Sequence, residues 1–228
     1  EYICDVGIYL NNAVKNNKQI MFEAQLGALK DIDFGIYPYT SSSSTIAAYA
    51  PIGAGVPGLK LDRTIGIMKA YSSCVGEGPF TAEMFGEEAK ALREAGGEYG
   101  AATGRPRRVG PFDIVASRYG VRVQGATMLA LTKLDVMSYM DKIPVVTAYN
   151  IDGKITEEFP MGTDLDKATP VIEYVDGWKC DIGKCRKESE LPREAYNYIK
   201  YLEEKVGSPI KYVSVGPERD DYLTMGEL

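Results

Sequence analysis

Residues 128–135 decide the fold and the candidate function of this chain, and they read Met128-Leu129-Ala130-Leu131-Thr132-Lys133-Leu134-Asp135. The first four residues are apolar without alternation, which is typical of a strand that is buried on both faces of a parallel sheet. A lysine and an aspartate then stand two residues apart, just beyond the end of that strand. Ligands of open α/β sheets bind at the carboxyl ends of the strands. The stretch therefore predicts a ligand site at the end of a central parallel strand.

The chemistry of Lys133 and Asp135 suits guanine. A carboxylate can accept two parallel hydrogen bonds from the N1–H and the exocyclic amino group of guanine, and adenine offers no such pair of donors. The lysine stem can lie along the plane of the base while its ammonium stays in solvent. Short motifs also occur by chance. The alternative is therefore a strand that ends in a solvent-exposed ion pair between Lys133 and Asp135.

The composition places the chain among ordinary soluble proteins. It has 228 residues, enough for one large domain or two small ones, and it is 45% hydrophobic and 25% charged. The net charge of −6 gives no general reason to expect nucleic acid or an anionic membrane as a partner. No apolar run approaches the roughly 20 residues of a membrane span, and no signal peptide is visible. We therefore expect a cytoplasmic protein. Because residue 1 is glutamate, we also expect a longer parent protein.

The cysteines and histidines limit the chemistry. Histidine is absent, so a Cys/His zinc site is excluded and the commonest general acid or base is missing. Of Cys4, Cys74, Cys180 and Cys185, only the last two are close in sequence, and their spacing has no second pair. Reduced thiols of a cytosolic protein are expected, with a disulfide or metal role for Cys180 and Cys185 as the less favoured alternative.

Hydrophobic periodicity predicts an α/β fold in which a mainly parallel sheet is flanked by helices. Helices are expected at residues 5–16, 81–95, 113–119 and 192–206. Strands are expected at residues 19–22, 64–71, 128–131 and 210–215. Val6, Tyr9, Leu10 and Val14 are predicted to lie on one face of the first helix. Phe85, Ala89 and Leu92 are predicted to form the buried stripe of the second.

Residues 144–190 have a different sequence pattern, in which short strands and turns replace alternating strands and helices. Residues 144–149 and 154–159 flank an Asp152-Gly153 turn, which predicts a hairpin, and residues 171–175 predict a third strand. We interpret this region as a small antiparallel, β-rich insertion within a single domain that spans residues 1–228.

Two stretches are candidate anion sites. Arg105, Arg107 and Arg108 follow two glycines and a threonine, and their planar paired donors suit phosphate or carboxylate. The alternative is a solvated basic turn. Residues 31–58 contain four consecutive serines, whose hydroxyls suit a phosphate or a sugar, although a flexible segment would look the same. The sequence contains no G-x-x-x-x-G-K-[ST], so it lacks a phosphate-cradling Walker loop.

Four groups of segments, in this order, resemble adenylosuccinate synthetase, the family of enzymes that join aspartate to IMP using GTP. They are Phe22-Glu23 with residues 31–42, residues 75–80, residues 100–105, and residues 131–135 with Ser214-Val215-Gly216-Pro217. The resemblance covers essentially the whole chain but only the later part of the family pattern. It implies a P-loop-NTPase-like fold that is incomplete here. The phosphate loop, the catalytic aspartate and histidine, and the magnesium site of the family have no counterpart in this sequence.

The resemblance also implies a role for each matching residue. GTP is expected at Arg107, Lys133, Leu134, Asp135, Ser214, Val215 and Gly216. Aspartate is expected at Ala101, Ala102, Thr103, Gly104, Arg105, Pro106 and Arg107, and IMP at Gln25, Ser41, Val75 and Arg105. No catalytic residue and no metal ligand is expected in this chain, although Mg²⁺ is expected for the full enzyme. The family further implies a homodimer with shared active sites.

Several positions depart from the family pattern, and most lie in the predicted IMP pocket. Leu26 stands where the family has a glutamine, and Gln25 is one place early. Cys74 replaces a common arginine. Ser41 replaces a threonine and keeps the hydroxyl. In the loop predicted for aspartate, Ala102 replaces a threonine and Pro106 a basic residue, whereas the guanine segment keeps the pattern.

The reaction that the resemblance implies has two steps: GTP phosphorylates the 6-oxygen of IMP, and the amine of aspartate then displaces phosphate. We expect this chain alone to bind guanine nucleotide without turnover. Two alternatives remain open, a guanine-nucleotide-binding module without ligase activity and a non-catalytic remnant. Residues 103–108 favour the ligase, because a nucleotide switch needs no receptor for a carboxylate substrate.

Overall fold

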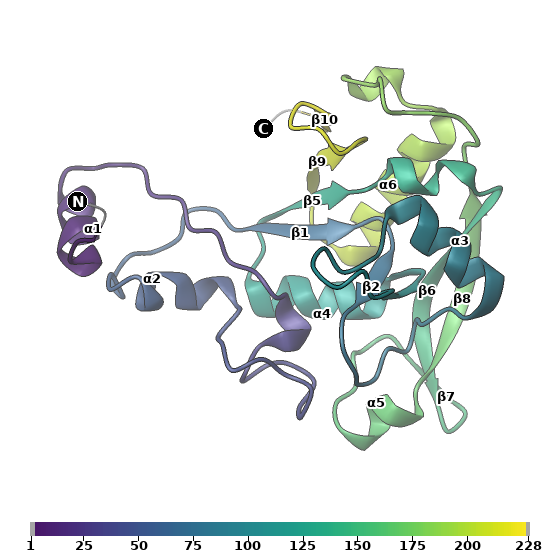
Figure 1. Ribbon diagram of the computed structural model, residues 1–228, viewed down its shortest axis with the longest axis horizontal. Coiled ribbons are helices and arrows are strands. Elements are labelled where there is room, and N and C mark those ends of the chain that lie inside the picture. Colours follow the sequence, from purple (N-terminus) through teal and green to yellow (C-terminus); the bar gives the residue numbers. More distant parts are fainter. Residues whose placement is uncertain (1–2, 227–228) are drawn as a thin grey trace.

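Within residues 3–226, the part of the chain that the computed structural model describes, a four-stranded sheet with the order β1-β5-β9-β10 forms the centre of the fold (Figure 1). β5 (Met128–Thr132) lies between β1 (Ile65–Lys69) and β9 (Ile210–Ser214) and is parallel to both. β10 (Tyr222–Thr224) runs antiparallel to β9. The prediction of a parallel strand at residues 128–131 is confirmed. Its burial on both faces is not, because Leu129 and Leu131 are buried whereas Met128 and Ala130 on the other face are only partly buried.

The other strands of the described residues form a two-stranded sheet and a second four-stranded sheet. β2 (Ser72–Cys74) pairs antiparallel with β3 (Arg108–Gly110). In the other sheet, the long strand β6 (Lys142–Ile151) is central. It pairs antiparallel with β7 (Lys154–Thr156) and β8 (Thr169–Asp176), and parallel with β4 (Phe112–Asp113). The fold is therefore α/β, as predicted, and its central sheet is mainly parallel with one antiparallel strand, β10.

The predicted hairpin is present at β6 and β7. Asp152 and Gly153 connect the two strands with φ angles of 51° and 87°, the left-handed conformation that a tight hairpin turn needs. The β6–β8 region is not a separate core, because Ile143, Val145 and Trp178 belong to the same buried cluster as Leu131 of the central sheet. The boundaries of an insertion at residues 144–190 stay a prediction.

The helices surround these sheets. The α-helices are α1 (Val6–Lys15), α2 (Ala50–Gly53), α3 (Gly86–Gly96), α4 (Ile114–Gln124), α5 (Thr163–Lys167) and α6 (Arg193–Val206), and short 3₁₀ helices occur at Ala28–Lys30, Ala47–Tyr49, Asp135–Tyr139 and Glu188–Glu190. α4 packs against α6 and β6, and α6 also packs against β8 and β9. The helix predicted at residues 192–206 is confirmed as α6, and its Tyr198, Ile199 and Leu202 are almost fully buried.

Two helices have boundaries that differ from the prediction. α3 begins at Gly86 instead of residue 81, so Phe85 precedes the helix and is 76% exposed, whereas Ala89 and Leu92 are buried as predicted. α4 continues to Gln124, five residues beyond the predicted end, and stops where Gly125 adopts a left-handed conformation.

The first 60 residues differ at two places from an ordinary packed fold. Figure 1 shows α1 and α2 at one end of the molecule, away from β6 and β8. α1 is present as predicted, but none of its residues is buried, so its apolar face with Val6 and Tyr9 packs against no core among the described residues. Residues 19–22 do not form the predicted strand, and Met21 is exposed. A strand needs a partner for its backbone groups, and an apolar tripeptide by itself does not supply one.

Asp113 joins the start of α4 to the second sheet. Its carboxylate accepts hydrogen bonds from the backbone N–H of Ala116 (2.9 Å), which caps the helix, and from the Tyr149 hydroxyl (2.6 Å). The side chain is buried. Burial raises the pKa of the Asp113 carboxyl to about 6, although the hydrogen bonds from Ala116 and Tyr149 oppose the shift.

We expect Asp113→Asn to remove a pH dependence of stability. An aspartate in the unfolded chain has a pKa of about 4. The native state therefore holds this proton more tightly, and its free energy of unfolding falls as pH rises from about 4 to about 6, by roughly 3 kcal/mol. Asparagine can still cap α4 but cannot ionise. In urea unfolding, the free energy of unfolding of the variant should rise by about this amount relative to that of the parent as pH increases from 4 to 7. Asp164→Asn, which removes an exposed carboxylate, controls for net charge; a difference that is constant with pH would contradict the prediction.

Candidate functional site

The chain turns sharply where β5 ends. Lys133 adopts a left-handed φ of 59°, and the next turn leads Asp135 into a 3₁₀ helix. Leu134 is fully buried and its backbone N–H donates to the carbonyl oxygen of Ser214 (3.2 Å). This hydrogen bond joins the carboxyl ends of β5 and β9. The structure thus brings together two of the predicted segments, residues 133–135 and 214–216.

Residues 214–216 form a tight turn at the end of β9. The Ser214 hydroxyl donates to the Gly216 carbonyl (2.9 Å), and the buried Val215 donates its N–H to the Asp221 carbonyl (2.9 Å). A Cβ on Gly216 would lie 2.5 Å from a carboxylate oxygen of Asp221, so glycine is required for this close approach. The turn is therefore held in one position beside Asp135.

Asp135 has an available carboxylate. Burial raises its pKa above the ordinary value, while hydrogen bonds from the backbone and the charge of Lys133 oppose the shift, and the charge of Asp221 adds to it. Among the described residues, no ion pair joins Asp135 to Lys133. The alternative of a simple solvent-exposed ion pair at the end of the strand is therefore wrong.

The ammonium of Lys133 points inward instead of remaining in solvent, which corrects the expectation from the sequence. It donates to the carbonyl oxygen of Gly96 (2.5 Å) and lies 3.8 Å from a carboxylate oxygen of Glu98. Gly96 is the last residue of α3, where unpaired carbonyls and the helix dipole favour a cation. With its ammonium fixed there, the side chain of Lys133 is 39% exposed beside Asp135.

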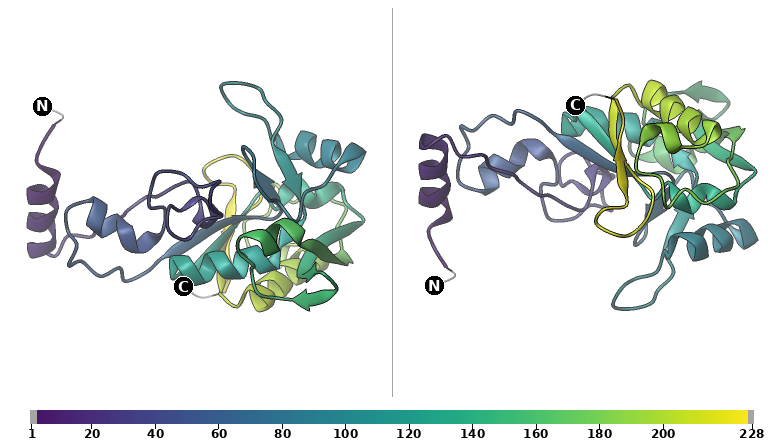
Figure 2. Two further views of the ribbon diagram at one scale, coloured as in Figure 1. Left: turned by 90° about the horizontal axis from the view of Figure 1, so that it is seen from below. Right: turned by 90° about the horizontal axis from the view of Figure 1, so that it is seen from above.

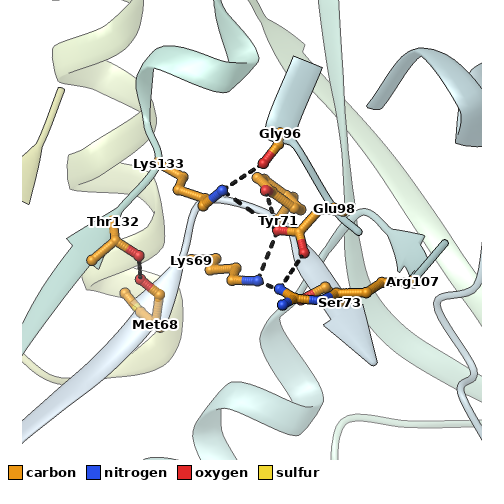
Figure 3. Close-up of polar contacts among 9 residues, drawn as sticks. All are labelled: Met68, Lys69, Tyr71, Ser73, Gly96, Glu98, Arg107, Thr132 and Lys133. Atoms are coloured by element: carbon orange, nitrogen blue, oxygen red, sulfur yellow. Dashed lines mark hydrogen bonds and ion pairs between the residues drawn. The ribbon is translucent and has the colours of Figure 1, made fainter. Parts of the chain in front are cut away.

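Glu98 is the centre of a charged cluster with Lys69, Tyr71, Arg107 and Lys133 (Figure 3). Its side chain is completely buried. Oε1 accepts from Lys69 Nζ (2.8 Å) and the Tyr71 hydroxyl (2.5 Å), and Oε2 accepts from Arg107 Nη1 (2.9 Å). Burial by itself raises the pKa of Glu98, but the hydrogen bonds from Lys69, Tyr71 and Arg107 outweigh it and hold the pKa below its ordinary value. The cluster is thus one buried carboxylate surrounded by three cations.

The sequence alone does not predict this cluster. A lone glutamate between Gly97 and Tyr99 carries no motif, and Lys69 lies 29 residues earlier in the chain. One signal was available: Glu98 is the acidic residue that immediately precedes the arginine-rich loop. Its partners are assembled by β1, the end of α3 and the end of β5, which only the folded chain brings together.

The loop at residues 99–106 is a hairpin whose two sides are joined by backbone hydrogen bonds. Arg107 donates its N–H to the Glu98 carbonyl (2.9 Å), and Gly100 donates to the Arg105 carbonyl (2.8 Å). Residues 101–106 at the tip are exposed and project from the body of the molecule (Figure 2). The residues predicted to bind aspartate therefore share one protruding loop, with Glu98 and Arg107 at its base.

The three arginines do not act as one clamp. Arg105 is exposed on the loop, and Arg107 is paired with Glu98. Arg108 makes a two-pronged ion pair with Glu83 (2.9 and 2.5 Å) and donates to the Gly78 carbonyl (2.8 Å). The interpretation of residues 105–108 as a single anion clamp is thus wrong for Arg108, whose donors are committed within the protein.

Arg108 instead holds the turn that follows β2. A Cβ on Gly78 would lie 2.6 Å from the Tyr39 ring, so this turn is held between Tyr39 and Arg108. Val75, which begins the turn, is exposed. The predicted IMP residue Val75 is therefore presented on a fixed turn.

The other predicted IMP residues are more scattered. The Ser41 hydroxyl donates to the Lys30 carbonyl (2.9 Å) within its own loop. Gln25 is exposed, and the neighbouring Leu26 has a left-handed φ of 77°. Among the described residues, no hydrogen bond or ion pair joins Gln25 or Ser41 to Val75 or Arg105. The structure does not gather these four residues by direct contact.

No metal centre is visible in the described part of the chain. Residues 3–226 contain no group of three or more histidine, cysteine, aspartate or glutamate side chains that could hold a metal ion. Cys4, Cys74, Cys180 and Cys185 are free thiols. Over the same residues, none of the helices combines the length and hydropathy that crossing a bilayer requires.

Comparison with known proteins gives one consistent result. The family model for adenylosuccinate synthetase matches residues 1–223. The adenylosuccinate synthetase of Streptomyces coelicolor is 48% identical over 223 residues, which are 97% of this chain and 52% of that protein. The one from Caldanaerobacter subterraneus subsp. tengcongensis is 46% identical over 98% of this chain and 53% of its own length. The chain thus spans about half the length of the curated relatives it matches.

Solved structures agree. A fully ligated adenylosuccinate synthetase from Plasmodium falciparum superposes with a TM-score of 0.93 and 36% identity, covering 98% of this chain and 54% of that one. A succinoaminodeoxyadenylate synthetase of cyanophage S-2L, bound to dGMP and dATP, has a TM-score of 0.56 at 14% identity and shares only the fold.

Proposed function

The chain belongs to the adenylosuccinate synthetase family, and from this we propose that it carries the guanine-, aspartate- and part of the IMP-binding site of a GTP-dependent ligase. The ligase joins L-aspartate to IMP and produces adenylosuccinate in purine biosynthesis. The observation that supports the proposal best is the hydrogen bond between Leu134 and Ser214, which holds the two predicted guanine-binding segments side by side.

In the proposed guanine pocket, the Asp135 carboxylate accepts from N1–H and the exocyclic amino group of the base. The stem of Lys133 lies along one face of the base, and residues 214–216 border its edge. Asp135 is half-buried and has no ion-pair partner among the described residues; its carboxylate accepts from nearby backbone N–H groups and keeps further lone pairs that can accept from a base. Adenine has no matching pair of donors, so this pocket selects GTP over ATP.

The protruding loop is the proposed receptor for aspartate. Thr103 and Arg105 lie at its exposed tip and Arg107 at its base, so they offer a hydroxyl and two guanidinium groups to the two carboxylates of the substrate. Arg107 also faces GTP, and Arg105, Gln25, Ser41 and Val75 contribute to the IMP site. The full protein is proposed to act as a homodimer, as the resemblance to the family implies.

The chemistry of the proposed reaction has a simple physical reason. The 6-oxygen of IMP is a poor leaving group until a phosphoryl group from GTP is attached to it, after which the amine of aspartate can displace phosphate. The residues of this chain bind and orient the three substrates. Mg²⁺ is expected in the complete enzyme, but the acidic residues described here do not gather into a metal-binding group, so no step is assigned to a metal held by them.

The proposal predicts selective binding without turnover. In calorimetric titrations of the 228-residue chain, we expect GTP to bind at least tenfold more tightly than ATP, because two hydrogen bonds to a carboxylate are lost with adenine. With IMP, L-aspartate and GTP together, we expect no adenylosuccinate by chromatography. Equal affinities for GTP and ATP would contradict the guanine pocket. Formation of adenylosuccinate would contradict the proposal that this chain binds the substrates but lacks the catalytic residues.

A further inference from the structure

Glu98 is not among the residues proposed to bind substrate, although it contacts two of them, Lys133 and Arg107. We propose that Glu98 is a positioning residue that fixes Lys133 and Arg107 relative to each other, so that the guanine pocket and the base of the aspartate loop form one rigid unit. The inference rests on the proposed function, because it takes Lys133 and Arg107 as substrate-binding residues.

The first support is the division of contacts between the two oxygens of Glu98. Oε2 binds Arg107 Nη1 at 2.9 Å, on the side of the aspartate loop. Oε1 faces the other side, 2.8 Å from Lys69 Nζ and 3.8 Å from Lys133 Nζ. One rigid carboxylate group therefore lies between a residue at the base of the loop and a residue in the guanine pocket.

The backbone adds to this arrangement. The Glu98 carbonyl accepts from the Arg107 N–H (2.9 Å), so the same residue fixes both the main chain and the side chain of Arg107. Gly96, two residues earlier, accepts from Lys133 Nζ (2.5 Å). Residues 96–98 thus touch both Lys133 and Arg107, and a shift of this short segment would move both (Figure 3).

Charge explains why a carboxylate is needed at this position. Lys69, Arg107 and Lys133 are 28, 32 and 39% exposed, so each is partly removed from water beside two other cations. Without an anion between them they would repel one another and turn toward solvent. Glutamine has nearly the same shape but is neutral, and its NH₂ group would have to face one of the cations.

A purely structural role for Glu98 makes a different prediction. A buried glutamate that only stabilises the fold would change nucleotide affinity equally whether or not Lys133 is present. A positioning residue acts partly through Lys133, so its effect on GTP affinity should be smaller when the ammonium of Lys133 has already been removed. A double-mutant cycle separates the two roles.

The test measures GTP affinity for Glu98→Gln, Lys133→Met and the double variant. We expect Glu98→Gln to weaken GTP binding roughly tenfold, the cost of losing one charge-assisted hydrogen bond. In the Lys133→Met background, the same substitution should cost clearly less, because only the part of its effect that acts through Arg107 remains. Glu98→Asp, which keeps the charge, should recover part of the affinity. Asp113→Asn, which neutralises another buried carboxylate in the separate cluster around Tyr149, is the matched control and should bind GTP like the parent.

Circular dichroism of each variant reports the fold. If Glu98→Gln does not fold, the cycle is run on a background of Lys69→Met, which removes one of the surplus cations and lies outside the proposed substrate-binding residues. Parent-like affinity in Glu98→Gln, or an equal loss with and without Lys133, would overturn the inference. Failure of the parent chain to prefer GTP over ATP would instead overturn the proposed function, so the two failures are distinguishable.

Discussion

Replacing Asp135 by asparagine is expected to weaken GTP binding about 100-fold and to make xanthosine triphosphate the preferred nucleotide. The carboxylate accepts from two donors of guanine, and each such charge-assisted hydrogen bond contributes about 1.5–3 kcal/mol. Asparagine keeps one acceptor but presents its NH₂ group to the exocyclic amino group of guanine. Two donors then face each other, and a loss of about 3 kcal/mol corresponds to roughly 100-fold in affinity.

Xanthine reverses this mismatch. It carries an oxygen where guanine carries the exocyclic amino group, so it accepts from the NH₂ group of asparagine while its N1–H still donates to the side-chain oxygen. The measurement is a calorimetric titration of the parent and the Asp135→Asn chain with GTP and with xanthosine triphosphate. Asp152→Asn, an exposed position in the β6–β7 turn, is the control for the loss of one charge. An unchanged ratio of the two affinities would remove Asp135 from the proposed pocket.

The sequence predicted the guanine segment because its signal is local. A run of four apolar residues is sufficient to predict a strand of a parallel sheet, and the residues that follow it must then lie at the carboxyl ends of the strands. The structure confirms β5 between two parallel strands, and the resemblance to adenylosuccinate synthetase is confirmed by the family model over residues 1–223. The role of each site residue stays a prediction.

The packing of α1, the position of the Lys133 ammonium and the role of Glu98 could not be predicted, because each depends on contacts between distant segments. The periodicity of α1 was correct, because the helix exists, but its apolar face meets no core among the described residues. The ammonium of Lys133 was placed in solvent because its partners, Gly96 and Glu98, are 37 and 35 residues away in sequence. Glu98 itself was missed for the same reason. Local patterns predict elements, whereas the partners of a charged side chain depend on the tertiary fold.

The loop that presents Ser41 offers a final prediction, because it is held together by one carboxylate. Asp31 is 1% exposed, and its oxygens accept from the backbone N–H groups of Thr45 (2.6 Å), Asp33 (2.9 Å) and Phe34 (3.0 Å). We expect Asp31→Ala to lower the free energy of unfolding by about 4 kcal/mol, because three charge-assisted hydrogen bonds are lost and their donors are left without partners.

The effect should reach the whole fold instead of staying in the loop. Phe34 accepts a hydrogen bond from the Tyr119 hydroxyl of α4 (2.6 Å), and Ile36 packs in the same buried cluster as Val115 and Tyr149. Urea unfolding measures the loss. Asp33→Ala, the same substitution at an exposed aspartate two residues away, is the matched control and should change stability by no more than about 0.5 kcal/mol.

The pH dependence of this loss gives an independent check on its cause. Burial raises the pKa of Asp31, but the backbone hydrogen bonds from Thr45, Phe34 and Asp33 outweigh it and hold the pKa below its ordinary value. The stabilisation by Asp31 is therefore present above the unfolded pKa of about 4 and is lost as pH falls through the folded pKa. The difference between the parent and Asp31→Ala should shrink in that acidic range. A difference that stays constant down to the folded pKa, or equal losses in Asp31→Ala and Asp33→Ala, would show that packing alone, and not the buried carboxylate, holds this loop.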